Sequence, residues 1–125
     1  VGGFSEVLAK EVRDFGIRVT VAEPGGMRTH WAGSSMTIAE ASEPYKRVIA
    51  PVVQRMRDAD GNQPGDPARI ARVLLAVAAS PTPPLRLLLG SDAVAVARDA
   101  ARVRAEEDAQ WLEVSESTSY LDDEA

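Results

Sequence analysis

The stretch Gly16-Ile-Arg-Val-Thr-Val-Ala-Glu-Pro-Gly-Gly-Met-Arg-Thr29 decides the fold of this chain. Its residues 17–23 form a short, β-branched and nearly uncharged run, which predicts a strand covered on both faces, as in a parallel sheet. Pro24 ends the strand, while Gly25 and Gly26 permit positive φ and leave room for a ligand beside the backbone. The turn therefore lies at the carboxyl end of a strand, where open α/β sheets bind ligands. An ordinary strand-to-loop turn is the alternative.

Hydrophobic spacing predicts four helices and one further strand around this stretch. The first helix is expected over 1–14, and the second starts near Tyr45 and is kinked at Pro51. The third has Asp66 as its N-cap and Pro67 in its first turn. The last helix runs from Gly90-Ser-Asp92 to about Val114, and the second strand covers 85–89. Gly16 is expected to end the first helix. A strand, a helix and a strand in this order predict a parallel, right-handed crossover in an α/β fold.

The first three helices carry apolar residues at helical spacing, which predicts one core-facing side for each. These residues are Phe4, Val7, Leu8 and Val12 with Phe15 just beyond, then Val48, Ile49, Val52, Val53 and Met56, and then Ile70, Val73, Leu74 and Val77. Two starts are open for the second helix. One is a capping box at Thr37-x-x-Glu40, and the other is Ser42-Glu43-Pro44.

Composition narrows the class of protein. The 125 residues, 45% of them hydrophobic, suit one globular domain, although two strands alone make a poor independent sheet. The absence of cysteine excludes disulfides and thiolate metal sites, and a single histidine, His30, leaves almost no material for a metal site. The net charge of -5 argues against a nucleic-acid partner. Without an apolar run of about 18 residues, we expect no membrane segment and a cytoplasmic location.

Two runs of the sequence resemble the second half of the short-chain dehydrogenase/reductase family. The first runs from Phe4-Ser-Glu-Val-Leu-Ala-Lys-Glu-Val12 through Phe15-Gly-Ile-Arg-Val19 into Glu23-Pro-Gly-Gly-Met-Arg-Thr29; the second joins Gly65-Asp-Pro-Ala-Arg-Ile-Ala71 and Pro83-Pro-Leu-Arg-Leu-Leu-Leu-Gly90. The resemblance covers nearly the whole chain, and its specificity lies in the order and spacing of the motifs. It implies the C-terminal part of a Rossmann-type, doubly wound parallel sheet. One domain would cover 1–125, with a substrate-loop region at about 30–60 and an acidic tail at 115–125.

The resemblance also implies a partial cofactor site. Pro24, Gly25, Gly26, Met27 and Thr29 would hold the nicotinamide end of NAD or NADP, with the threonine bonding the carboxamide or the pyrophosphate and Met27 contributing backbone. His30, Trp31 and Met36 would belong to the loop that covers the substrate. A solvated or packed role remains open for His30, and core packing or a subunit contact for Trp31 and Met36. Glu23 lacks a partner carboxylate for acid catalysis.

Several family motifs do not occur in the sequence. These are the glycine-rich phosphate loop, the Asn-Ala-Gly stretch, the catalytic serine and the Tyr-x-x-x-Lys pair, since neither Tyr45 nor Tyr120 has a lysine four residues later. We therefore expect no catalytic residue in this chain and no turnover by it alone. The resemblance implies a homo-oligomeric, NAD(P)-dependent parent enzyme that reduces a carbonyl or oxidises a secondary alcohol. The alternative is a non-catalytic, truncated paralogue that acts as an interaction module.

Three questions remain open at this point. The sequence opens on Val1, so either the true start lies upstream or a non-standard start codon was read literally. The substrate is not identified, because residues 30–60 give only an apolar hint. NAD and NADP are not distinguished, since the residue that reads the ribose lies outside this sequence.

Overall fold

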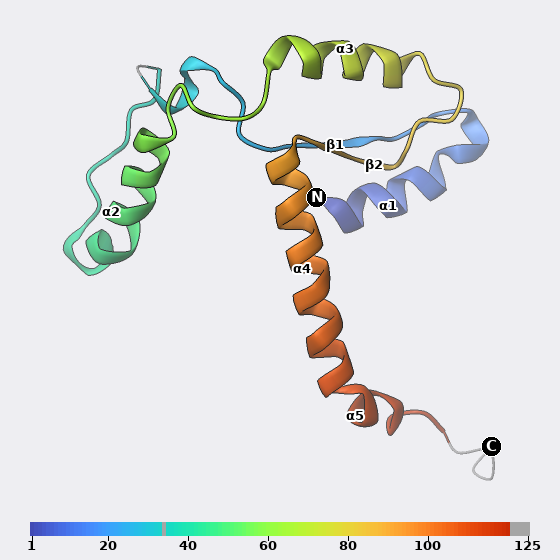
Figure 1. Ribbon diagram of the computed structural model, residues 1–125. Coiled ribbons are helices and arrows are strands. Elements are labelled where there is room, and N and C mark those ends of the chain that lie inside the picture. The colour runs from blue at the N-terminus through green and yellow to red at the C-terminus, as the bar shows by residue number, and fades with distance from the viewer. Residues whose placement is uncertain (34, 121–125) are drawn as a thin grey trace. The chain divides into compact units, whose positions relative to one another are not determined.

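The computed structural model describes residues 1–33 and 35–120 and divides the chain into two compact units, Val1–Ala93 and Val94–Ala125. The elements are α1 (Gly2–Glu11), the 3-10 turn η1 (Arg13–Phe15), β1 (Val21–Pro24), the 3-10 turn η2 (His30–Ala32), α2 (Glu43–Asp58), α3 (Pro67–Ala78), β2 (Arg86–Leu89), α4 (Ser91–Gln110) and α5 (Leu112–Glu116) (Figure 1). Helix α4 begins in the first unit and continues into the second. The predicted combination of two strands and several helices is confirmed.

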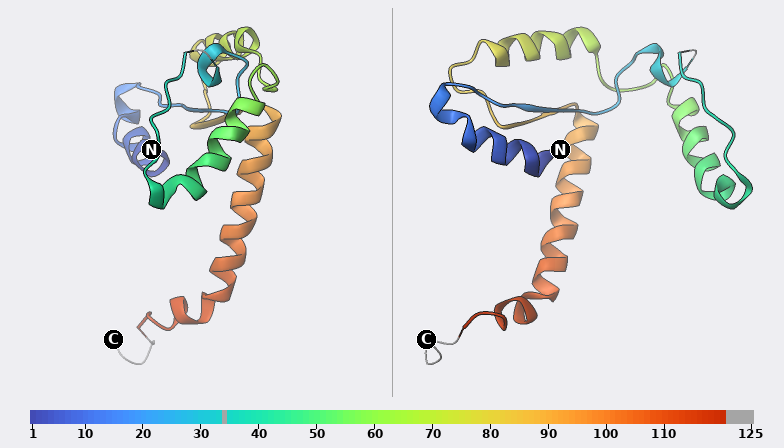
Figure 2. Two further views of the ribbon diagram at one scale, coloured as in Figure 1. Left: turned by 90° about the vertical axis from the view of Figure 1, so that its left-hand side faces the viewer. Right: turned by 180° about the vertical axis from the view of Figure 1, so that it is seen from behind.

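The two strands form a parallel pair, as the strand-helix-strand order predicts. The register places Val21 opposite Arg86 and Pro24 opposite Leu89. Helix α3 lies in the connection between the strands. In the first unit, α1 and α3 lie on opposite sides of the strand pair in Figure 1 and in the view from behind (Figure 2, right). This is the layer arrangement expected of a parallel α/β crossover.

Strand β1 is shorter than predicted. Residues 17–20 precede the ladder, which begins with the Val21 N–H donating to Leu85 O at 2.8 Å. The partner segment 80–84 contains prolines, which have no N–H and a fixed φ, and it is held by a single side-chain bond from Thr20 Oγ1 to Pro84 O at 2.7 Å. The ladder therefore starts where the prolines end. The second strand is shorter by one residue for the same reason.

The prediction of a strand covered on both faces is wrong for this chain. Along β1, half-buried and exposed residues alternate, and Ile17 ahead of it is 55% exposed. Among the described residues, only Ala32 and Leu89 qualify as buried apolar side chains. The predicted helix faces are also largely open, with Phe4, Val48 and Leu74 exposed. Two strands offer too little surface to cover them.

The helix ends follow local sequence signals in most cases. Asp66 caps α3 as predicted, with its Oδ1 accepting from the Ala68 N–H at 2.8 Å and the Arg69 N–H at 3.3 Å. Gly16, at φ 73°, ends η1 rather than a single helix over 1–14. Helix α2 starts at Glu43 after Ser42, so the capping box at Thr37 is not used.

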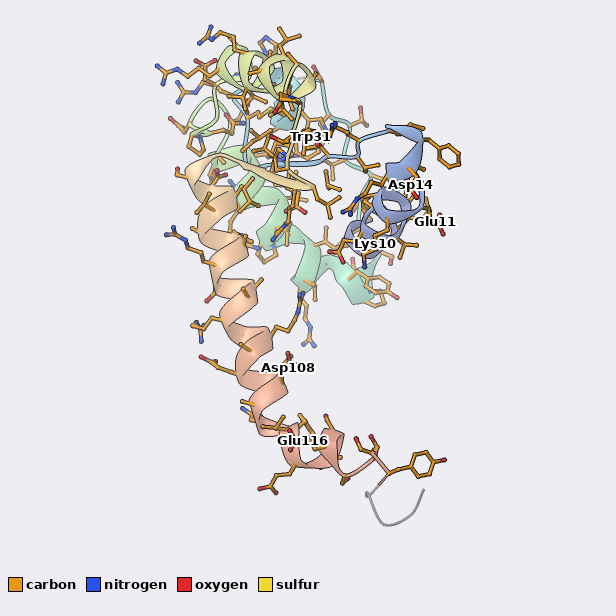
Figure 3. All side chains as sticks on the ribbon, turned by 90° about the vertical axis from the view of Figure 1, so that its right-hand side faces the viewer. Lys10, Glu11, Asp14, Trp31, Asp108 and Glu116 are labelled. Carbon is orange, nitrogen blue, oxygen red and sulfur yellow. The ribbon has the colours of Figure 1, made fainter. Side chains whose placement is uncertain are left out.

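In its described residues, the second unit contains the rest of α4 and the short helix α5. Arg102 bridges Asp99 and Glu106 along α4, with N···O distances of 2.7 Å to each. Figure 3 shows Asp108 and Glu116 on this helical part of the chain, and Lys10, Glu11 and Asp14 on α1 and the turn after it. The predicted last helix is interrupted at Trp111, between α4 and α5. Within the described residues, no helix has the length and apolarity needed to cross a bilayer.

Candidate functional site

The segment Pro24–Thr29 follows β1 at the carboxyl end of the sheet, and we call it the glycine loop. Its backbone is tied to two neighbouring segments. The Gly25 N–H donates to Leu89 O at 2.9 Å, which extends the strand pairing by one residue. The Gly65 N–H donates to Gly26 O at 2.9 Å, and the Arg28 N–H donates back to Gly65 O at 2.9 Å. The loop is thus bonded to the end of β2 and to the start of the α3 region.

A third tie comes from a side chain. The Gly26 N–H donates to Asp92 Oδ2 at 2.7 Å, across 66 residues of sequence. Asp92 lies in the first turn of α4, where the helix dipole favours a carboxylate. The hydrogen bond from Gly26 lowers the pKa of Asp92, and the backbone of Ala93 acts in the same direction. Asp92 is therefore a carboxylate held in its charged form against the glycine loop.

Neither glycine of the loop is needed for an unusual φ, and only Gly25 is required by lack of space. Positive φ occurs at Gly16, Gly61 and Gly90 and at neither Gly25 nor Gly26. A Cβ at Gly25 would collide with the Asp92 carboxylate. A Cβ at Gly26 would meet Asp92 and Gln63 only at 3.5 Å, which is ordinary contact. The space beside Gly25 is thus filled by Asp92, whereas the predicted reason was access for a ligand.

Gln63 and Arg28 support the loop from another side. Gln63 is 8% exposed, and its Oε1 is buried without a hydrogen-bond partner among the described residues. The Arg28 side chain donates twice to Gln63 O, from Nε at 3.3 Å and from an Nη at 3.1 Å. Sequence reasoning left Arg28 without a role and did not select Gln63. Neither position has a motif that would have identified it.

Thr29 ends the glycine loop and begins the next turn. It is the N-cap of η2, where its hydroxyl accepts from the Trp31 N–H at 3.4 Å. Its own N–H donates to Met27 O at 2.9 Å. The residue is exposed, and the hydroxyl keeps its donor for a further partner. Met27 is half-buried and pairs with Gly65 in an isolated bridge.

The three predicted substrate-loop residues are not gathered at one point. His30 and Trp31 lie on η2 and are exposed, Trp31 to 63% (Figure 3). Met36 is half-buried and lines a separate pocket of about 250 Å³ with Ala32, Gly33, Ile38, Arg57 and Asp60. Hydrogen bonds in this segment are short-range, such as Gly33 N–H to His30 O at 3.2 Å.

Glu23 is engaged in a cross-strand ion pair. Arg86 Nε lies 2.7 Å and an Arg86 Nη 2.6 Å from Glu23 Oε2. The hydrogen bond from Arg86 lowers the pKa of Glu23, so this carboxyl is not a proton donor near neutrality. The pair links β1 to β2 on one face of the sheet. In the described part of the chain, no group of three acidic, histidine or cysteine side chains is placed to hold a metal ion.

A parallel strand pair with a glycine-containing loop at its carboxyl edge is the arrangement of a Rossmann-type α/β fold. Comparisons with known proteins narrow the fold class to a family. The chain is 49% identical over 115 residues to "Oxidoreductase BOA17" of Botryotinia fuckeliana, which covers 92% of this chain and 42% of that protein. It is 33% identical over 63 residues to the rat 17-beta-hydroxysteroid dehydrogenase type 6, which covers 50% of this chain and 19% of the relative.

A solved structure gives the same result. The crystal structure of a short-chain dehydrogenase from Streptomyces avermitilis matches 95% of this chain with a TM-score of 0.77 and 33% identity, over 43% of its own length. No family model matches the chain. The chain belongs to the short-chain dehydrogenase/reductase family and aligns with part of a protein named as an oxidoreductase. It spans less than half the length of the relatives it matches.

Proposed function

We propose that this chain supplies the nicotinamide-end loop of an NAD(P)-dependent oxidoreductase that reduces a carbonyl or oxidises a secondary alcohol. The observation that carries the proposal is the position of the glycine loop. It follows a parallel strand, at the sheet edge where doubly wound folds bind nucleotides, in a chain 49% identical to a named oxidoreductase. The corresponding segment in this family is its C-terminal half.

The residues of the loop fit such a cofactor. Thr29 is exposed and keeps a hydroxyl donor, while Gly26 carries no side chain that would keep a ring from the backbone. Pro24 to Gly26 are held in place by bonds to Leu89, Asp92 and Gly65 rather than by the ligand. A loop fixed in advance loses little conformational freedom on binding. When bound, the nicotinamide supplies hydride transfer, and the chain binds and orients it.

The chain's own residues do not supply a proton for the carbonyl oxygen. Glu23 is paired with Arg86 and ionised, and the two tyrosines have no lysine at the family spacing. We therefore assign this chain a cofactor-holding role and place proton transfer on residues outside this sequence. The chain alone is expected to consume no NADH or NADPH with any carbonyl. Measurable turnover by the isolated chain would overturn this assignment.

The binding role is tested on the full-length protein that carries this chain. We expect Thr29→Val to raise the dissociation constant of NAD(H) or NADP(H) about tenfold, because a hydrogen bond to the cofactor is lost. Thr29→Ser keeps the hydroxyl and should bind nearly as wild type. Thr37→Val is the matched control, since Thr37 is exposed in the loop that follows. Equal affinity of all variants, measured by fluorescence titration, would argue against a cofactor contact at Thr29.

Association with a second copy and a cytoplasmic location are further parts of the proposal. Exposed apolar side chains support association, among them Phe4 at 73% and Val7 at 55% on α1. The lack of cysteine is compatible with a reducing compartment. Light scattering on the full-length protein tests the first part. A monomer across the accessible concentration range would contradict it.

A further inference from the structure

We propose that Asp92 is the positioning residue of the glycine loop, holding Gly26 in the conformation that receives the nicotinamide end of the cofactor. The inference rests on the proposed function and adds a residue to it. Asp92 lies 66 residues from the loop in sequence and belongs to the helix after β2. It acts through the Gly26 backbone and not by touching the substrate.

The first support is the geometry of the contact. The Gly26 N–H reaches Asp92 Oδ2 at 2.7 Å, which is short for a bond from a backbone amide and fits a charged acceptor. Such bonds are stronger than those between neutral groups. Thr29 lies three residues after Gly26, so fixing Gly26 also limits where the threonine hydroxyl can lie.

The second support is the space that the chain clears for this carboxylate. A Cβ at Gly25 would collide with Asp92, and a Cβ at Gly90 would come within 2.6 Å of Asp92 Oδ1. Gly90 has φ 119°, a conformation that favours glycine, and it precedes α4 directly. Two glycines from different strand ends thus make room for one side chain.

The third support is the state of the carboxylate itself. Among the described residues, Oδ1 is buried without a hydrogen-bond partner, so the bond from Gly26 to Oδ2 is the contact that holds the carboxylate, and the residue is only half-buried overall. The pKa of Asp92 is lowered, chiefly by the bond from Gly26. The charge is therefore stabilised by backbone N–H groups of the loop and of the helix start. A carboxylate used only to cap α4 would not need the loop.

The test compares three variants of the full-length protein that carries this chain. Asp92→Ala removes the acceptor, Asp92→Asn keeps a neutral oxygen of nearly the same shape, and Asp99→Ala removes a carboxylate from the same helix far along the sequence from the loop. Asp99 pairs with Arg102, which retains Glu106. The readouts are the dissociation constant of the nicotinamide cofactor, the KM of the carbonyl substrate, and hydrogen exchange at the Gly26 amide.

We expect Asp92→Ala to raise the cofactor dissociation constant by about tenfold or more, the size of one charge-assisted hydrogen bond. The carbonyl KM should stay within about twofold, and Asp99→Ala should resemble wild type. Asp92→Asn should recover part of the affinity, because its amide oxygen still accepts from Gly26 but without the charge. The Gly26 amide should be protected in the wild type and exchange faster in Asp92→Ala. Unchanged cofactor affinity in Asp92→Ala, or an equal loss in the Asn and Ala variants, would overturn the proposal.

Two outcomes are kept apart by the exchange measurement. If Asp92→Ala does not fold, the wild type and Asp92→Asn still report on the bond, and an unprotected Gly26 amide in the wild type would refute the proposal. If the wild type binds no nicotinamide cofactor, the proposed function fails. In that case, protection of Gly26 that is lost on substitution of Asp92 would still support a loop-positioning role.

Discussion

The glycine loop, residues 24–29, and the segment 30–42 that follows it are joined in sequence but held in different ways. The glycine loop is bonded to distant segments at Leu89, Asp92, Gly65 and Gln63. The following segment has local bonds in its described residues, such as Met36 N–H to Gly33 O at 3.3 Å. Long-range ties resist local opening better than bonds between close neighbours.

This difference agrees with the functions proposed for the two segments, which are cofactor binding and covering of the substrate. The same cofactor binds in every reaction cycle, so the groups that hold it bind more tightly when they are fixed in advance. Substrate-covering segments are usually loops with few tertiary ties, because they open and close. If the proposed cofactor site is correct, the glycine loop is its fixed part and the described residues of 30–42 are its less constrained part.

The largest effect is expected from Gly25→Ala. The added Cβ meets the Asp92 carboxylate, so this side chain must turn away and lose the bond from the Gly26 N–H or the loop must shift, at a cost of about 3 kcal/mol in the free energy of unfolding. Gly26→Ala is the matched control, because its Cβ would lie 3.5 Å from the nearest atoms. Urea denaturation of both variants measures the difference. Equal costs at the two positions would mean that Asp92 does not fill the space beside Gly25.

A smaller loss is expected from Arg28→Met. The variant removes two donors to Gln63 O, which would cost about 1 kcal/mol in the free energy of unfolding. Arg69→Met is the control, since Arg69 is exposed and pairs with Asp66 at 3.4 Å. Hydrogen exchange in the glycine loop should rise in Arg28→Met only. If both variants behave alike, the Arg28 guanidinium does not contribute to the rigidity of the loop.

Acid should weaken the tie between Asp92 and the glycine loop. The pKa of Asp92 in the folded chain is lowered from an ordinary value of 3.8, mainly by the Gly26 bond. A lowered carboxyl pKa stabilises the fold above the unfolded value, and this contribution is lost as pH falls through the folded value. The stability difference between wild type and Asp92→Asn should therefore be largest at neutral pH. A difference that is constant from pH 7 to pH 3 would contradict the bond.

Sequence reasoning worked where one local signal decides the structure. Asp66 followed by Pro67 places the start of α3. Gly16 has the expected positive φ of 73° but ends the 3-10 turn η1, since α1 already ends at Glu11. The parallel pairing followed from the order of elements. Signals of equal local quality can compete, as at Thr37 and Ser42, and the structure uses the second, where proline follows within two residues.

The rest depended on contacts between segments far apart in sequence. Nothing near Gly25 in the sequence indicates that Asp92 lies beside it, although both follow the ends of adjacent parallel strands. With that pairing known, an acidic residue just after β2 would have been the signal. The predicted burial of β1 and of the Phe4 face failed for a related reason, since the chain supplies two strands and too little surface to cover them.

The smallest effect on stability is expected from Trp31→Ala. Trp31 is 63% exposed on η2, so its removal should change the free energy of unfolding by about 0.5 kcal/mol or less. If the segment 30–42 covers the substrate, the same variant should still raise the KM of an apolar carbonyl substrate while leaving cofactor affinity unchanged. Steady-state kinetics with varied carbonyl and varied cofactor separate the two constants. A loss of cofactor affinity instead would place Trp31 with the fixed part of the site, and the division at Thr29 would have to move toward the C-terminus.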